Sequence, residues 1–440
     1  MQNNIKAEKL SGFLKAFRIE SPNDEVFSEI YYNNTMAVRT GMKNKSPVDD
    51  LFDECTTPLH KNAHLLMGHR GCGKSTELYR LKQRFEEAGQ PVFTVDFISE
   101  ANPYEATCWD LMLMLTEGLC QIAIDYKLNV PKELLKSVLS YLLTDEDKKT
   151  ETDILIDAGI EGGIEANTPA ILGGIIKTFV KIKSGMKAST NTRTTITEKM
   201  KKRASDWIEY INEITNQIVF KLSGKQPIMI FENIDKIQPP EKALDILRYP
   251  FLAEIPFPVI YTFPISLYYD ERFSLIKNFY KPHMLPMIKV SNANHSENKE
   301  GINILMEIIK LRADMKLFDE FALKKLIKQT GGVLLDLFDC IISAARLAAR
   351  RGSEKIEIED ADNALSDLRE ELSRQVEISD NEKLEKIYND IKYREQIIDK
   401  EFILKKMQAL VILEYRNGDR WHDLHPMIVN FLIGQGVIKN

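Results

Sequence analysis

Features of secreted, disulfide-bonded and membrane-spanning chains are scarce in this sequence. Its five cysteines are scattered and none lies in a C-x-x-C spacing, which argues against a disulfide framework or a zinc site and favours a reduced cytosol. Residues 1–6 lack the apolar core of a signal peptide. The nearest approach to a membrane span, residues 169–180, is short and contains Lys177. We therefore expect a cytoplasmic protein without a membrane span.

A strong charge of either sign is also missing. The 440 residues carry a net charge of -6, which gives no overall attraction to nucleic acid or to an anionic membrane. A hydrophobic content of 44% and a charged content of 28% are ordinary for a globular protein. The length alone suggests about three domains.

Residues 68–75 read Gly-His-Arg-Gly-Cys-Gly-Lys-Ser, a complete G-x-x-x-x-G-K-[ST] phosphate loop. The glycines allow successive backbone N–H groups to turn inward around a phosphate. Lys74 would reach the β- and γ-phosphates, and the Ser75 hydroxyl would bind Mg²⁺. The residues expected to contact the nucleotide here are Gly68, His69, Arg70, Gly71, Cys72, Gly73, Lys74, Ser75 and Thr76.

The flanking segments fit a phosphate loop better than a chance glycine-rich turn. Residues 63–67 form a short apolar run that suits a buried strand. Residues 76–85 have helical spacing, with Leu78, Leu81 and Phe85 on one stripe. A strand before the loop and a helix after it are what the motif requires.

Further strands alternate with helices, which predicts a P-loop α/β fold: a parallel sheet with helices on both faces. We expect strands at 91–98, 228–231, 258–263 and 283–290, and a helix at about 103–125. The strand at 228–231 delivers Glu232, Asn233 and Asp235 to its carboxyl end, the edge at which open α/β sheets bind ligands. Ser75 and Glu232 are the expected metal ligands. The expected catalytic residues are Lys74, Glu232, Asn233, Asp235 and Thr262.

Residues 145–225 interrupt the alternation and look like an insertion in the nucleotide domain. Their first part is acidic, whereas residues 177–203 are rich in lysine and arginine, with Glu198 as the single acid. This basic tract could contact the phosphates of nucleic acid or lipid. We favour a solvated or self-paired surface, because acidic residues lie directly upstream. A helix at about 195–222 would lead back to the core.

From about residue 294 the chain becomes helical, and its last part combines helices with a hairpin. Asn417-Gly418, between two β-prone runs, is a strong hairpin signal, and Pro426 begins a final helix. Helices plus a hairpin describe a winged helix, whose balanced charge favours packing over reading a DNA groove. The expected divisions are a lead-in at 1–60 packed on the nucleotide domain, a P-loop ATPase core at 61–293, an all-α lid at 294–375 and a winged helix at 376–440.

With these motifs the chain resembles the AAA+ and STAND group of P-loop ATPases, with an origin-recognition-like core, from about residue 30 onward. Residues 231–236, Phe-Glu-Asn-Ile-Asp-Lys, are similar to the acidic strand-end motif of that group, and residues 331–337 are similar to its lid segment G-G-x-P-R-x-L. The resemblance implies ATP or ADP with Mg²⁺ as cofactors. It also implies that the Thr262 strand lies between the phosphate-loop strand and the Glu232 strand. Thr262 would either sense the γ-phosphate or be an ordinary strand-end threonine.

In STAND proteins a histidine of the winged helix contacts the β-phosphate of ADP. His425 fits that place, His422 is the alternative, and a merely structural histidine is an equal possibility. By this resemblance, ADP would hold the domains closed and ATP would release them to oligomerise.

Three departures from the family pattern predict slow hydrolysis. Glu232 stands where an aspartate is usual, Asn233 where a catalytic acid is usual, and Leu335 where the lid arginine is usual. Asn233 cannot accept a proton from the attacking water, and losing a general base costs about 10²–10⁴ in rate. Turnover would therefore be slow, or Asp235 would supply the base.

Two functions are compatible with these features. The first is an ATP-binding, slowly hydrolysing switch that controls assembly with itself or with a separate effector or sensor protein; bacterial defence or stress signalling is the setting that the family suggests. The alternative is a DNA-acting AAA+ ATPase of the replication or transposition loader type. That protein would use the winged helix and the Lys177–Arg203 tract on nucleic acid, with Arg248 or Arg272 as an arginine finger in trans.

Overall fold

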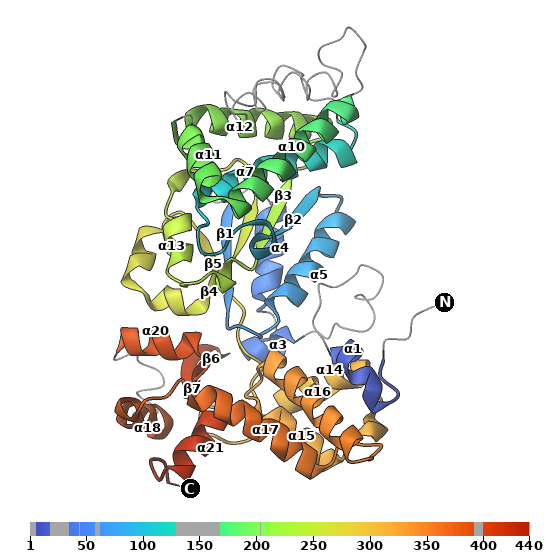
Figure 1. Cartoon of the computed structure of the whole chain (residues 1–440), viewed down its shortest axis with the longest axis vertical. Helices are drawn as coiled ribbons and strands as arrows, with labels where there is room; N and C mark the ends of the chain where they lie inside the picture. Colours follow the sequence, from blue (N-terminus) through green and yellow to red (C-terminus); the bar gives the residue numbers. More distant parts are fainter. Residues whose placement is uncertain are drawn as a thin grey trace.

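The computed structural model describes residues 6–17, 35–43, 45–57, 62–128, 168–202, 204–390 and 399–439. In these ranges an α/β layer lies above a helical bundle and a winged helix, in the view of Figure 1. No helix among them is long and apolar enough to cross a membrane. The acidic part of the expected insertion and Arg203 lie outside the described residues.

The core sheet has five parallel strands in the order β2-β3-β4-β1-β5, so β4 lies between the phosphate-loop strand and the Glu232 strand, as expected. The last strand ends before the predicted 283–290, because Pro286 has no N–H to donate to the ladder. The strands are β1 (Ala63–Gly68), β2 (Val92–Asp96), β3 (Ile228–Glu232), β4 (Val259–Pro264) and β5 (Lys281–Met284).

Both faces of this sheet are buried, so alternate residues of a strand enter different cores. In β3, Ile228 and Ile230 belong to the core shared with the lid and the winged helix, whereas Met229 and Phe231 belong to the opposite core. This is why the strands read as continuous apolar runs. The helices of the α/β layer are α4 (Pro47–Thr56), α5 (Lys74–Glu87), α6 (Phe97–Glu100), α7 (Cys108–Asp125), α10 (Thr168–Ala188), α11 (Thr190–Lys202), α12 (Ala204–Lys221) and α13 (Lys242–Leu247).

Where a helix was expected at 195–222, the structure describes α11 up to Lys202 and α12 from Ala204, and residue 203 lies outside the described residues. Residue Arg193 of α11 is buried and pairs with Asp110 of α7 at 2.8 Å, which docks α11 on α7. Short 3₁₀-helices complete this layer: η3 (Ile234–Lys236), η4 (Pro250–Leu252), η5 (Ile265–Tyr269) and η6 (Glu271–Leu275).

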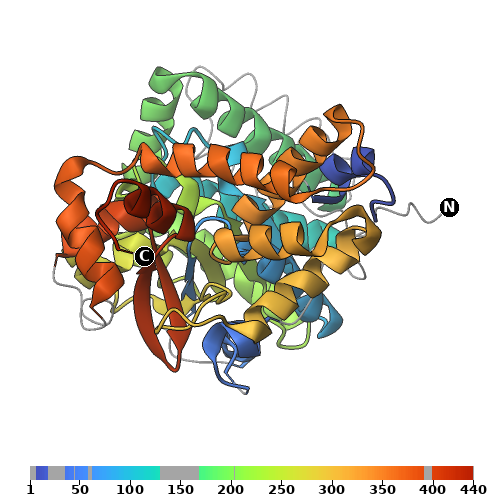
Figure 2. The ribbon, with the colours of Figure 1, turned by 90° about the horizontal axis from the view of Figure 1, so that it is seen from below.

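The lid and the winged helix lie side by side beneath the sheet, as Figure 2 shows. The lid contains α14 (Lys299–Arg312), η7 (Met315–Leu317), α15 (Glu320–Gln329), α16 (Leu334–Arg350) and α17 (Ile358–Ser373). After η8 (Ile378–Asp380), the winged helix contains α18 (Asn381–Asn389), α20 (Lys400–Gln408), the antiparallel hairpin β6 (Ile412–Asn417) and β7 (Asp419–Leu424), and α21 (Pro426–Gly434).

The first described residues pack on the lid, so the expectation that the lead-in packs on the nucleotide domain is wrong for them. They form η1 (Leu10–Gly12) and α1 (Phe13–Phe17). Phe13 stacks on Phe318 with ring centroids 5.3 Å apart, and Phe17 meets Phe338 at 5.4 Å. Later in the lead-in, α4 packs on α5 and β5, and α3 (Met36–Thr40) contacts β6 and α14.

Candidate nucleotide-binding site

The phosphate loop lies between the carboxyl end of β1 and the first residue of α5. Gly71 and Gly73 have φ values of 75° and 101°, a backbone region that only glycine enters without strain. α5 begins at Lys74, so the positive end of its dipole faces the loop. Within the loop His69 and Cys72 are buried, while Arg70 is exposed. This geometry is that of an anion-binding strand–loop–helix turn.

Lys74 is buried in the loop and anchored on both sides. Its Nζ donates to the carbonyl oxygens of Gly68 and His69, at 2.9 and 3.0 Å, and lies 2.9 Å from Asp235 Oδ2. Burial raises the pKa of Asp235, but the charge and hydrogen bond of Lys74 outweigh it, so that pKa is lowered overall. Asp235 is therefore a charged partner for Lys74 and a weak base.

The carboxyl ends of β2 and β3 bring three polar groups beside the loop. Ser75 hydrogen-bonds Glu232, so the two expected metal ligands are neighbours. Asp96 ends β2 directly across from Glu232, and its Oδ1 accepts from Asn233 Nδ2 at 2.8 Å. Burial, supported by the Asp96 and Asp235 carboxylates and opposed by the Ser75 hydrogen bond, raises the pKa of Glu232 to about 7.

Asp96 was not among the predicted site residues. Its place at the end of a parallel strand was the signal that could have identified it. Thr262, by contrast, was predicted, and it lies beside β3: its Oγ1 accepts from the N–H of Ile234 at 3.0 Å, and its side chain hydrogen-bonds Asp235. These bonds position Asp235, so they fit the strand-end interpretation of Thr262 at least as well as contact with a phosphate.

Arg39 is a second site residue that was not predicted, and it anchors the phosphate loop through buried hydrogen bonds. It is 2% exposed, and its guanidinium donates to the carbonyl oxygens of Cys72 at 2.8 Å and Pro286 at 2.6 Å. Burial lowers the pKa of Arg39, and nearby Glu77 opposes that shift. Nothing in the sequence singles out this arginine, because it acts on a loop more than thirty positions away.

The lid segment that resembles G-G-x-P-R-x-L lies directly on the phosphate loop. A Cβ placed on Gly71 would come within 2.7 Å of Leu335 Cβ and 3.1 Å of a Val333 methyl group. The N–H of Leu335 also donates to the Gly71 carbonyl at 3.4 Å. The residue at the usual lid-arginine position therefore faces the loop with an aliphatic side chain.

The winged helix touches the phosphate loop through His69. The N–H of Glu414 in β6 donates to His69 Nε2 at 2.8 Å. Burial lowers the pKa of His69 to about 4; Glu414 opposes this shift, whereas Lys74 and His422 add to it. Glu414 in turn accepts a hydrogen bond from Tyr269 of η5, so loop, core and hairpin meet in one buried polar cluster.

The two histidines proposed to contact nucleotide lie in different places. His422 is buried in the same cluster, 3.3 Å from the Tyr269 hydroxyl and 3.6 Å from Glu414. His425 caps the amino end of α21, where its Nδ1 accepts from the Met427 N–H at 3.1 Å, and its Nε2 lies 3.4 Å from Asp336 of the lid. His422 is thus linked to the loop through Glu414, whereas His425 joins the winged helix to the lid.

The fold class follows from the described elements together: the order of the sheet, the loop between β1 and α5, the acidic end of β3, the lid on the loop and the following winged helix. The chain has a P-loop α/β fold followed by a helical lid and a winged helix. Oxygen donors at Ser75, Glu232 and Asp96 suit Mg²⁺, and the loop glycines suit a phosphate. The site therefore fits magnesium and a nucleoside triphosphate, with Lys74 placed to hold the phosphates.

Comparison with known proteins adds structural likenesses only. No family model matches the chain, and no curated protein sequence matches it. It is similar to the solved structures of the Aeropyrum pernix ORC1 protein in complex with DNA (13% identity, TM-score 0.38, 89% of this chain and 92% of that chain) and of Cdc6p from Pyrobaculum aerophilum (11%, 0.36, 94% and 99%). The Aeropyrum pernix ORC2 protein in its ADPNP-ADP complexes is also similar (11%, 0.38, 92% and 99%). Likenesses of this size say nothing about function.

Outside this site, the cations singled out in the sequence are largely paired. Lys183 binds Glu117 at 2.5 Å, and Arg193 is buried against Asp110. Arg272 binds Asp270 through two hydrogen bonds, and Arg248, which is 55% exposed, lies 3.7 Å from Asp245. The exposed lysines of the described basic tract are Lys177, Lys181, Lys187, Lys201 and Lys202.

Proposed function

We propose that the chain is an ATP-binding, slowly hydrolysing AAA+ switch whose nucleotide controls the packing of the winged helix. The observation that carries this proposal is the hydrogen bond from the Glu414 N–H to His69, a residue of the phosphate loop itself. A phosphate that reshapes the loop would move His69, and with it the hairpin. The switch would then govern assembly with itself or with a separate partner protein.

Slow hydrolysis fits the groups at the end of β3. Asn233 cannot act as a base, and its side chain donates to Asp96. Asp235 has a lowered pKa and is held by Lys74, so it would remove a proton from water inefficiently. Mg²⁺ held by Ser75 and Glu232 would then serve binding more than turnover.

The test compares the molar mass of the chain with Mg·ADP and with a non-hydrolysable ATP analogue, by size exclusion with light scattering. The proposal predicts a larger assembly, or a more expanded chain, with the analogue. His69→Ala should give the expanded behaviour with either nucleotide, whereas Lys82→Ala, which removes an ion pair with Glu86 within α5, should behave like the wild type. Equal mass and equal hydrodynamic radius with both nucleotides would contradict the proposal.

A DNA-acting ATPase is the second candidate. One observation favours it: lysines are exposed on α10 and at the end of α11. Against it, α20, which occupies the place of a groove-reading helix, packs on η5, and its Lys406 binds Asp380 at 2.5 Å. In this arrangement the helix is turned toward the core.

Salt dependence separates the two candidates. Real DNA binding should weaken linearly in log K against log[salt], and changing Lys177, Lys181, Lys201 and Lys202 together to Ala should flatten that slope. A control changes Lys383 and Lys386 of α18 to Ala; these lysines pair with Asp399 and Glu382. Absence of duplex retardation at low salt would remove this candidate and leave the switch.

A further inference from the structure

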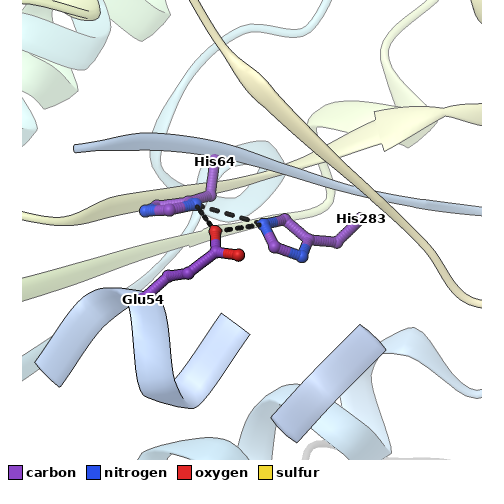
Figure 3. Close-up of side chains that lie close together, drawn as sticks. All are labelled: Glu54, His64 and His283. Carbon is purple, nitrogen blue, oxygen red and sulfur yellow. Dashed lines mark hydrogen bonds and ion pairs between the residues drawn. The ribbon is translucent and has the colours of Figure 1, made fainter. Parts of the chain in front are cut away.

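Three metal-ligating side chains meet at the amino end of β1, at the opposite end of the strand from the phosphate loop. Glu54 comes from α4, His64 from β1 and His283 from β5, and their polar atoms converge (Figure 3). His64 Nδ1 lies 3.2 Å from His283 Nε2. Glu54 Oε2 lies 3.6 Å from the first nitrogen and 3.4 Å from the second. About 13 Å of extended strand separate His64 from Gly68.

We propose that Glu54, His64 and His283 bind one Zn²⁺, which joins α4 to the edge of the sheet. Zinc bound at about 2.0–2.2 Å by nitrogen and oxygen in a tetrahedron places its ligand atoms about 3.3–3.5 Å apart. The three separations, 3.2, 3.4 and 3.6 Å, fall around that value. An octahedral facial triad would bring the same atoms to about 3.0 Å from one another.

The chemistry of the three groups suits a zinc ion. His64 is fully buried and His283 is 5% exposed, so burial, together with the nearby Lys281 charge, lowers the pKa of both: to about 3 for His64 and about 4 for His283. Both rings are therefore neutral ligands at pH 7. Asp50 is the charged group that opposes this shift at His283.

Neighbouring groups hold two of the ligands, His283 and Glu54, in position. His283 hydrogen-bonds the backbone of Pro47, which can only accept. Because Nε2 faces Glu54 and His64, the donor to Pro47 is Nδ1, and Nε2 keeps its lone pair for a metal. Lys281 binds the other oxygen of Glu54, Oε1, at 2.5 Å, which aims Oε2 at the two rings.

A hydrogen bond between the two imidazoles is the simpler explanation of the 3.2 Å contact. It leaves Oε2 of Glu54 buried with no hydrogen-bond partner among the described residues, although this oxygen points at both rings. A buried carboxylate oxygen in that position costs free energy unless something binds it. A cation shared by all three groups supplies that partner, and water would complete its coordination.

The experiment titrates zinc into the full-length chain after treatment with a chelator, in buffer without nucleotide. Competition against a chromophoric chelator should show one equivalent bound per chain, and His283→Gln and Glu54→Gln should each weaken that affinity by more than about a hundredfold. Cobalt in place of zinc should give the intense visible absorption of a tetrahedral site. His295→Gln is the matched control, since that histidine lies beside Tyr388, away from the cluster, and it should bind zinc like the wild type.

Two results would overturn the zinc site: binding well below one equivalent, or an affinity that survives both His283→Gln and Glu54→Gln. A weak, octahedral cobalt spectrum would also overturn it. If a variant fails to fold, the wild type still decides the matter, because a zinc ion that binds the folded chain must raise its Tm in proportion to ln(1 + [Zn]/Kd). An unchanged Tm in saturating zinc would leave only the hydrogen-bonded histidine pair.

Discussion

The two ends of β1 carry a candidate nucleotide site and a proposed zinc site, and the two differ in how their residues are arranged in the sequence. At the carboxyl end, eight consecutive residues form the phosphate loop, and Lys74 and Ser75 follow from their spacing alone. At the amino end, Glu54, His64 and His283 come from three elements, and more than two hundred positions separate the first ligand from the last. One site is a local motif, and the other exists only in the folded chain.

This difference explains why the cysteine pattern of the sequence did not predict a zinc site. The argument rested on cysteine spacing, which is a local pattern. The proposed site uses no cysteine, and it depends on the pairing of β1 with β5 and on the packing of α4 against β5. A lone histidine in a strand carries no sign of such a partner.

The largest effect is expected from a change at the amino end of β1, which tests whether the two sites are independent. His283→Gln should weaken zinc binding by more than about a hundredfold, because it removes a direct ligand. Its affinity for Mg·ATP, measured by calorimetry, should stay within about twofold of the wild type, since the two sites lie about 13 Å apart along the strand. If ATP affinity falls together with zinc affinity, the two ends are not independent.

The corresponding change at the carboxyl end of β1 is Lys74→Ala. It should weaken ATP binding by about 10- to 100-fold, because a charge-assisted hydrogen bond is worth about 1.5–3 kcal/mol. Zinc stoichiometry should not change. Lys82→Ala on the exposed side of the same helix, where Lys82 pairs with Glu86, is the control and should bind ATP normally. Unchanged calorimetric affinity in Lys74→Ala would remove the nucleotide site.

A smaller effect sharpens the description of the carboxyl end. Glu232→Gln should reduce the gain in ATP affinity that Mg²⁺ provides by about tenfold, because it replaces a carboxylate ligand by a neutral amide. Affinity measured with excess chelator and no Mg²⁺ should stay near that of the wild type. An equal loss with and without Mg²⁺ would show that Glu232 supports the loop and does not hold the metal.

The smallest effect expected concerns His69. Its pKa is lowered to about 4 from the ordinary 6.5, so between these values the unfolded chain binds a proton that the folded chain does not. Stability should therefore fall on acidification, by about 1 kcal/mol between pH 6.5 and 5.5. The free energy of unfolding of His69→Gln, measured with denaturant in the presence of a metal chelator, should lack this part of the pH dependence. Parallel curves for the two proteins would contradict the neutral, buried His69.

Much of the fold could be predicted because the strands of a doubly covered sheet are uninterrupted apolar runs. The place of the Thr262 strand, between the phosphate-loop strand and the Glu232 strand, and the hairpin around Asn417-Gly418 agree with expectation. The packing of α11 on α7 and of α1 on the lid could not be foreseen, since both depend on buried pairs such as Arg193–Asp110 and Phe13–Phe318. Such contacts join residues that are distant in sequence.

The site divides in the same way. Ser75 and Glu232 were predicted as metal ligands and lie together, although their roles remain predictions. Arg39 was missed, because a charged residue that anchors backbone carbonyls has no sequence pattern. His69 was predicted only as a member of the loop; its contact with the winged helix depends on how the domains pack.

The backbone amide of Glu414 offers the most direct test of the central claim, that the phosphate loop controls the winged helix through His69. Hydrogen–deuterium exchange at this amide should be slow with Mg·ADP and faster with Mg and a non-hydrolysable ATP analogue. In His69→Ala it should be fast with both nucleotides. Equal protection with the two nucleotides, in a wild-type chain shown by calorimetry to bind both, would contradict the account.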